Sequence, residues 1–500
     1  MSGVQTTWTV FKDTYTQRKC LLKIAMSFIL WLLLLVSASC TVLELDEDTA
    51  YCNGIDLREI TIREVHLHYL TGRLTVQNVT DCYLNRIHAL NPTLNAVIST
   101  NPNAHLDAIK LDLKMRRGEW GSLYGIPILV KDNIAVDGMQ TTAGTLFLKD
   151  IFPKQEAIVV KRLRKHGAII LGKTNLSELS GCQGGATRFP YNLTGKVYGS
   201  SSGSAAAVAA NLALGALGTE TVGSIICPSS VTWVFGFKPT FNKRQNQGLI
   251  HVAKSLDSIG VIARTSRDTD ILANAIAFRK HSLYILKNPA IGILRFPRFE
   301  ASFPEHVALI THRLEQLDGV RVIPNIEFTM PYEYIKNITL GIFAEFHQDI
   351  KDYLAQSPNP NLKDVRSIVE WYKTNPTTRT FQLKALKRVA NLTPLEIFTF
   401  KKKLLTIKKR VREALSSLLA SNSLDVIAIP SHCDLGGFTF PNIAGFPIIN
   451  VPLGYSADAT SISMAIFGNH NSDPLLLSLA NMIETANPTP RVPPSFHQQI

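Results

Sequence analysis

The sequence predicts an α/β fold with a mixed β-sheet, and two observations carry that prediction. Short apolar segments alternate with helical ones, as in residues 125–132 (GIPILVKD), a helix around residues 157–167, and residues 168–173 (AIILGK). The chain has 500 residues with 45% hydrophobic content, which suffices for one large domain or two smaller ones. Its 30 glycines and 25 prolines are ordinary numbers, so the composition excludes a collagenous or largely disordered chain.

The N-terminus combines a basic segment, residues 1–23, with a long apolar run, residues 24–43. Positive charge before such a run, and acidic residues 44–48 after it, direct a chain into the secretory pathway. The run predicts either a cleaved signal peptide, because Val36 and Ala38 satisfy a small-residue cleavage rule, or a signal-anchor that spans the membrane. We therefore expect a secreted or single-pass membrane-anchored protein whose remaining chain is lumenal or extracellular.

Cysteines and glycosylation sequons fit that compartment. Five of the seven cysteines follow the apolar run, and none forms a C-x-x-C pair, so we expect no metal site and one disulfide, Cys52 to Cys82. Asn175 belongs to a sequon that follows an apolar strand-like run, and we expect it to be too buried for modification. The other N-x-[ST] sequons are those of Asn78, Asn192, Asn337 and Asn391.

The remaining elements follow in chain order. Residues 56–90 predict two amphipathic helices, because their apolar positions recur with a period near 3.6. Residues 281–392 are the least patterned part, and we expect them to form peripheral helices around a substrate pocket. The last third returns to strands and turns, in residues 425–430, 440–454 and 461–468.

The formal net charge of +13 raises the question of an acidic partner. The positive charges are spread along the chain, and there is no zinc-ligand spacing, RNA-binding signature or basic arm, so we expect no nucleic-acid partner. The densest cluster, residues 400–415, carries leucines and isoleucine at helical spacing. This predicts the solvated face of a packed helix, with a membrane-surface helix as the alternative.

Residues 199–228 place five serines and five glycines around one helix of small residues. Gly218 and Gly223 allow a tight turn whose N–H groups point at one anion, and Ser224 in that turn would lie beside an oxyanion hole. A serine nucleophile needs a base. Lys131 ends an apolar run, so burial would lower its pKa and let it accept a proton. A glycine-rich anion or phosphate loop is the alternative explanation.

On these residues the chain resembles the amidase signature family of serine hydrolases. The likeness covers residues 57–494, and we assign residues 56–495 to one amidase domain. The resemblance implies a central mixed β-sheet flanked by helices on both sides. The segments GTET and SIICPSS are similar to those of the fungal and plant branch of the family. The motifs that carry the resemblance are LNAVISTNPNA, YGIPILVKDNI, MQTTAGT, AIVVKRLRKHGAIILGKTNLSEL, GGATRFPYN, GSSSGSAAAVAAN, LGTETVGSIICPSS, GFKPT and NIAGFPIINVPLG.

The resemblance implies a Ser–Ser–Lys triad that hydrolyses a small-molecule amide without metal or organic cofactor. Lys131 matches the base, Ser200 the bridging serine held by a cis peptide bond, and Ser224 the nucleophile. The expected oxyanion hole consists of the backbone N–H groups of Thr221, Val222, Gly223 and Ser224.

Several positions depart from the family pattern, so a catalytically weakened protein is an alternative. Val222 stands where many relatives have glycine, and its β-branched side chain disfavours a positive φ. Ile226 replaces an arginine that is common elsewhere, and Gly260-Val261 replaces a Gly-Pro pair. In residues 241–251, the family's glycine, arginine and proline positions hold Asn242, Asn246 and His251.

Three other functions remain as alternatives. Residues 199–203 also fit the G-x-S-x-G nucleophile elbow of α/β-hydrolases, with Ser201 attacking, although the preceding segment YNLTGKVY is polar rather than strand-like. An amidotransferase-type subunit would use the same triad to release ammonia for companion subunits, which a secretory N-terminus argues against. A binding module without activity would not react with a serine-directed probe.

Overall fold

The computed structural model describes residues 49–181, 185–295, 300–301, 303–375, 382–431, 433, 437–455, 461–488, 491 and 494. The basic segment 1–23 and the apolar run 24–43 lie outside these residues. Within the described ranges, no helix combines the length and apolar character that crossing a bilayer requires.

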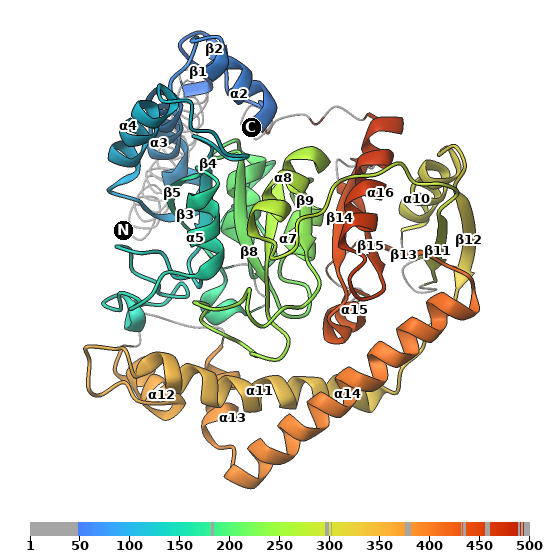
Figure 1. Ribbon diagram of the computed structural model, residues 1–500. Coiled ribbons are helices and arrows are strands. Elements are labelled where there is room, and N and C mark those ends of the chain that lie inside the picture. The colour runs from blue at the N-terminus through green and yellow to red at the C-terminus, as the bar shows by residue number, and fades with distance from the viewer. Residues whose placement is uncertain are drawn as a thin grey trace, which may run out of the picture.

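An eleven-stranded mixed sheet runs through the middle of the protein (Figure 1), which confirms the α/β class predicted from the sequence. The pairs β11–β12, β11–β13, β4–β8 and β4–β5 are parallel, and the other neighbours are antiparallel. From one edge to the other the strands are β12 (Arg321–Ile326), β11 (Ala290–Leu294), β13 (Val426–Pro430), β15 (Ser461–Gly468), β14 (Ile448–Tyr455), β9 (Phe235–Lys238), β10 (Ser258–Ala263), β8 (Gly215–Glu220), β4 (Pro127–Lys131), β5 (Ile169–Thr174) and β3 (Val97–Thr100). Two small separate sheets pair β1 (Tyr51–Cys52) with β2 (Ile55–Asp56), and β6 (Arg188–Phe189) with β7 (Asn192–Lys196).

Helices flank this sheet on both sides, and the long α11 and α14 cross below it in the view of Figure 1. The helix pair predicted for residues 56–90 is present as α2 and α3, each opened by a threonine capping box, Thr61 and Thr75. The helical elements are α2 (Ile62–Leu70), α3 (Val76–Leu94), α4 (Ala104–Met115), η1 (Leu146–Leu148), α5 (Ile158–Lys165), η2 (Glu178–Ser180), α6 (Ser202–Ala209), α7 (Ile226–Val231), α8 (Ser266–Ile276), α10 (Pro304–Glu315), α11 (Tyr332–Leu354), α12 (Val365–Thr374), α13 (Leu383–Ala390), α14 (Pro394–Ser421), α15 (Thr439–Ala444) and α16 (Asp473–Ala486).

The small-residue helix α6 is buried at every position. A Cβ atom at Gly203 would come within 2.4 Å of the carbonyl oxygens of Ala96 and Asn175, so only glycine fits there. Its alanines and serines let the helix approach the sheet closely, as the sequence predicted. The Ser200 segment is thereby fixed against β4 and β8.

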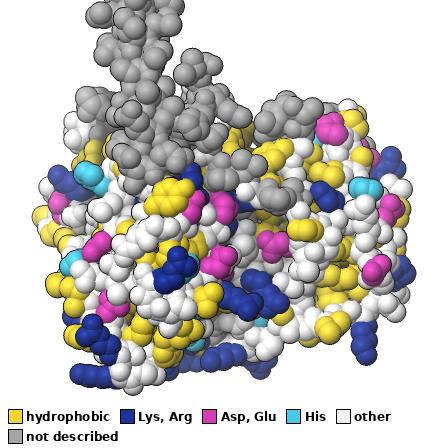
Figure 2. All heavy atoms as spheres, turned by 90° about the horizontal axis from the view of Figure 1, so that it is seen from above, with side chains coloured by type: hydrophobic (Ala, Val, Ile, Leu, Met, Phe, Trp, Pro, Cys, Tyr) yellow, Lys and Arg dark blue, Asp and Glu magenta, His cyan; other side chains and the backbone are white. Residues whose placement is uncertain are grey.

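The basic cluster of residues 400–415 lies in α14, as predicted. One side of α14 buries apolar residues such as Leu404, Ile407 and Val411, while Lys402 and Lys403 are exposed. On the face shown in Figure 2, the Lys and Arg side chains lie among acidic and apolar ones.

Residues 281–392 contain more than the peripheral helices expected from the sequence. They supply β11 and β12, which extend the sheet to its edge, in addition to α10, α11, α12 and α13. The prediction was incomplete because β11 is a five-residue apolar segment, which is too short to show a periodic pattern.

Two disulfides join the described cysteines. The Cys52–Cys82 bridge confirms the predicted pair, with Cα atoms 5.8 Å apart. The second bridge, Cys227–Cys433, was not predicted, because its cysteines are 206 positions apart and no local pattern connects them. It ties α7, which follows Ser224, to the segment after β13.

Candidate active site

Two neighbouring parallel strands, β4 and β8, place the predicted base at the carboxyl ends of the strands. Lys131 is the last residue of β4, and Glu220 is the last residue of β8. The carboxyl ends of parallel strands lie on the same side of the sheet. The loop that follows β8 and holds Ser224 therefore begins beside Lys131.

Lys131 is completely buried and surrounded by hydroxyl groups. Its Nζ lies 2.7 Å from the Oγ of Ser200 and 3.0 Å from the Oγ of Ser201. A third contact, of 2.7 Å, joins Nζ to the Oγ1 of Thr219. Burial lowers the pKa of Lys131 to about 7, although the carboxylates of Glu220 and Asp257 oppose the shift. An amine with this pKa is neutral in a large fraction of molecules at neutral pH, which is the state that a general base requires.

Of the two predicted serines, Ser200 has its hydroxyl within hydrogen-bond distance of Lys131, and the described contacts of Lys131 do not include Ser224. Ser200 is fully buried, and it follows a cis peptide bond with Gly199, as the family resemblance implied. The backbone carbonyl of Ser224 accepts a 3.0 Å hydrogen bond from the N–H of Ser201, which joins the two segments. Ser224 is 8% exposed, whereas Ser200 is not exposed at all. Both serines are buried, and Ser224 is the less completely buried of the two.

The turn of residues 221–224 is shaped by Gly223. Its φ is +150°, and a Cβ atom there would lie 2.5 Å from the ring of Phe438. Val222, in contrast, does not adopt a positive φ. The backbone strain expected from valine at this position is therefore absent, because the glycine conformation falls one residue later.

Glu220 fixes the C-terminal end of this turn. Its buried carboxylate accepts the backbone N–H groups of Ile225 and Ile226, the two residues after the predicted nucleophile, and the amide of Asn442. Burial raises its pKa to about 7. Ile226 itself is buried in an apolar cluster, so the residue that replaces the family arginine packs instead of forming an ion pair.

Asp257 fixes the N-terminal end of the turn. One carboxylate oxygen accepts a 2.6 Å hydrogen bond from the hydroxyl of Thr221, and the other lies 3.1 Å from Nδ1 of His251. The backbone N–H groups of Val252 and Ala253 also donate to Asp257, at 2.8 and 3.0 Å. Two carboxylates thus fix the turn from both sides.

The divergent loop of residues 241–251 belongs to this hydrogen-bond network. Asn246 is buried, and its amide donates to the backbone carbonyl of Asp257 while accepting the N–H of Ile259 at 3.0 Å. Gly260 and Val261 pair regularly in β10. Asn246 and His251, two of the residues that depart from the family pattern, therefore make polar contacts with Asp257.

Asn246→Ala is expected to lower the free energy of unfolding by about 2–3 kcal/mol, because it leaves a buried carbonyl and a buried N–H without partners. Urea unfolding measures the change. Asn242→Ala, in the same loop but exposed, is the matched control and should change stability by no more than about 0.5 kcal/mol. Equal stability of the two variants would contradict the structural role of Asn246.

Ser201 lacks the environment of a nucleophile elbow. It is fully buried, and its hydroxyl donates to the carbonyl of Thr219 at 3.2 Å besides contacting Lys131. The strand that precedes it, β7, belongs to a separate two-stranded sheet rather than to the main sheet. An elbow needs a strand of the main sheet leading into the helix, so the geometry argues against Ser201 as nucleophile.

Thr219, Glu220 and Asp257 are members of the site that sequence reasoning did not identify. Thr219 and Glu220 belong to the quoted motif LGTETVGSIICPSS, so their nearness to Ser224 was a signal that they contribute. In the described part of the chain, no group of three or more His, Cys, Asp or Glu residues forms a possible metal site.

Comparisons with known proteins identify a family and a fold for this chain. A family model described as Amidase matches residues 78–435. A probable amidase of Arabidopsis thaliana is 33% identical over 88% of this chain and 92% of its own. A subunit of the glutamyl-tRNA(Gln) amidotransferase of Caldanaerobacter subterraneus is 28% identical over 86% of this chain and 97% of its own. Among solved structures, the native peptide amidase of Stenotrophomonas maltophilia superposes with a TM-score of 0.80 at 29% identity, covering 88% of this chain and 99% of that one.

Proposed function

The chain belongs to the amidase family, a hydrolase family that acts on C–N amide bonds, and on that premise we propose that it hydrolyses a linear carboxylic amide through an acyl-enzyme. In this proposal Ser224 is the nucleophile, Ser200 relays the proton and Lys131 is the base. The observation that carries the proposal is the buried Lys131, whose pKa is lowered to about 7 and whose Nζ lies 2.7 Å from the Ser200 hydroxyl.

The proposed proton path uses the contact between Lys131 and Ser200. Ser224 attacks the amide carbon, and its proton passes to Ser200 while the Ser200 proton passes to the neutral amine of Lys131. The protonated Lys131 then returns a proton along the same path to the leaving amine, and the C–N bond breaks. A water molecule then attacks the acyl-enzyme carbonyl, and its proton follows the same path to Lys131. This step releases the carboxylic acid and restores Ser224.

Stabilisation of the tetrahedral intermediate is assigned to the backbone N–H groups of residues 221–224. Glu220 accepts the N–H groups that follow the nucleophile, and Asp257 anchors Thr221. The turn is therefore held before substrate arrives, which supports an active enzyme over a weakened one.

A panel of primary, fatty and aryl amides tests the proposal. We expect hydrolysis of at least one class by the isolated chain, and no hydrolysis by Ser224→Ala. An amidotransferase-type subunit would instead copurify with companion subunits and release ammonia only in their presence. Absence of both hydrolysis and labelling by a fluorophosphonate probe would point to a binding module.

We also propose that the protein enters the secretory pathway, through residues 24–43 as a signal peptide or a membrane anchor. The two disulfides support this location, because such bonds persist in oxidising compartments.

Glycosylation gives a direct test of that location. Asn192 and Asn391 are exposed, whereas Asn78 and Asn337 are half-buried on helices, so the first two are expected to carry most of the glycan. Glycosidase treatment of protein from a eukaryotic host should increase gel mobility, and Asn192→Gln with Asn391→Gln should remove most of that shift. Asn175 is half-buried and not fully buried as the sequence suggested. Asn175→Gln is nevertheless the control and should change nothing, because its side-chain amide donates a hydrogen bond to the carbonyl of Asn95. An unshifted protein found in the cytosol would overturn the proposal.

A further inference from the structure

Two of the residues that depart from the family pattern converge on one buried aspartate, Asp257. Asn246 donates to its backbone carbonyl, and Nδ1 of His251 lies 3.1 Å from one of its side-chain oxygens. Asp257 is 2% exposed, and the hydroxyl of Thr221 donates to its other side-chain oxygen at 2.6 Å. Thr221 is the first residue of the turn 221–224. The loop of residues 241–251 is therefore connected to that turn through a single side chain.

The hydrogen-bond pattern of Asp257 determines the direction of its contact with His251. Oδ1 accepts from Thr221, and Oδ2 accepts the backbone N–H groups of Val252 and Ala253 at 2.8 and 3.0 Å. Both oxygens act as acceptors, so Nδ1 of His251 carries a hydrogen and donates to Oδ2. Among the described side chains, His251 is the only basic one within ion-pair distance of this carboxylate.

The backbone of His251 is held by the segment that follows β4. The N–H of Ile250 donates to the carbonyl of Asn133 at 2.8 Å, and Leu249 forms a β-bridge with Ile134. The His251 side chain is 13% exposed, so the protein also packs around the ring. The imidazole is thus preorganised to donate to the carboxylate.

We propose that His251 is a positioning residue for the turn of residues 221–224, and that it acts through Asp257 and Thr221. This role rests on the proposed function, in which the backbone N–H groups of the turn stabilise the tetrahedral intermediate. The hydrogen bond from His251 orients the carboxylate, and the carboxylate in turn orients Thr221. Proline, which the family pattern has at this position, has no side-chain donor for this role.

Three substitutions of His251 test the proposal by steady-state amide hydrolysis. His251→Asn places an amide N–H near the position of Nδ1 and should keep kcat within about threefold of the unmodified protein. The amide of His251→Gln lies nearer the position of Nε2, and His251→Phe has no donor. Each of these two variants should lower kcat about tenfold with KM changed less than about twofold, because transition-state support is lost without loss of substrate binding. His347→Phe, the same change at a half-buried histidine of α11 outside these contacts, is the control and should keep full activity.

A double variant shows whether His251 acts through the turn. Thr221→Val removes the hydroxyl that joins Asp257 to the turn, and it should lower kcat by a similar factor. His251→Phe added to Thr221→Val should then have less than about a twofold further effect, because the connection is already broken. If His251→Phe fails to fold, His251→Gln takes its place. Independent, multiplied effects of the two changes would overturn the proposal, and so would an unchanged kcat in His251→Phe and His251→Gln.

Hydrogen exchange of the peptide that covers residues 219–227 gives a readout without substrate. His251→Gln should accelerate this exchange at least about threefold, and His251→Asn should not. Unchanged exchange in both variants would overturn the role of His251 and leave the assignment of the triad as it is. A lack of hydrolysis by the unmodified protein would instead overturn the proposed function and with it the catalytic role of His251, whatever the exchange rates.

Discussion

Ser224→Ala is expected to abolish fluorophosphonate labelling and to reduce amide hydrolysis by about four orders of magnitude, because it removes the attacking oxygen. Peptide mapping of the unmodified protein should find the label on the peptide that contains Ser224. Ser200→Ala should slow labelling without moving it, because Ser200 is buried against Lys131 and can only pass a proton.

The controls come from the same region. Ser229 lies in α7 close to Ser224, is fully buried, and its hydroxyl has no partner among the described residues. Ser229→Ala should therefore retain full labelling. Label found on Ser200 or Ser201 would show that the assignment of roles is wrong. Labelling of Val222→Gly but not of the unmodified protein would show a disabled oxyanion hole, despite the absence of a positive φ at Val222.

Lys131→Ala is expected to lower kcat/KM at neutral pH by about 10³-fold, the scale of general-base catalysis by a positioned side chain. Lys131→Arg should be equally inactive, because a guanidinium stays protonated and accepts no proton. The exposed Lys403→Ala is the control and should be fully active. Near-normal activity of Lys131→Ala would require another base.

The pH profile follows from the same group. Burial lowers the pKa of Lys131 to about 7, and only the neutral amine accepts the proton of Ser200. Above that pKa, kcat/KM should be constant, and below it kcat/KM should fall about tenfold per pH unit as the amine is protonated. A profile without an inflection near pH 7, measured over the range in which the protein stays folded, would contradict the role of Lys131.

Local pattern alone determined much of this protein. The apolar run that ends in Lys131 became β4, the small-residue run became α6, and the glycine turn holds Ser224. These predictions succeeded because residue type and spacing restrict the conformations of a short segment. The long, ordered motifs then sufficed to indicate the family and with it the mixed sheet.

Only the tertiary structure decided which distant groups surround these segments. Thr219 and Ser201 became further contacts of Lys131. Asp257 became a direct anchor of Thr221 and also a partner of His251, in the loop that the sequence suggested was weakened. The sheet order also placed β11 and β12 at its edge and joined Cys227 to Cys433.

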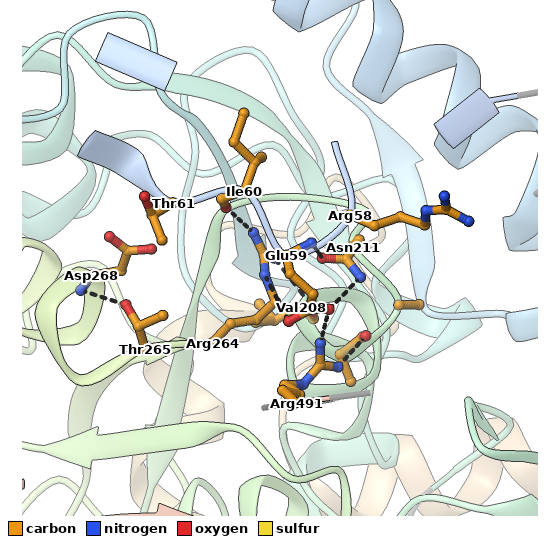
Figure 3. A network of polar contacts seen from close by, with 12 residues as sticks. Arg58, Glu59, Ile60, Thr61, Val208, Asn211, Arg264, Thr265, Asp268 and Arg491 are labelled. Atoms are coloured by element: carbon orange, nitrogen blue, oxygen red, sulfur yellow. Dashed lines mark hydrogen bonds and ion pairs between the residues drawn. The ribbon is translucent and has the colours of Figure 1, made fainter. Parts of the chain in front are cut away.

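The surroundings of Glu59 show the reason most clearly. Arg264 directly follows β10 and Arg491 lies far along the chain, yet both pair with the Glu59 carboxylate (Figure 3). These contacts are apparent only in the folded protein, after the strands have paired. A contact between residues so far apart in sequence depends on every segment around it, so no local pattern could have predicted it.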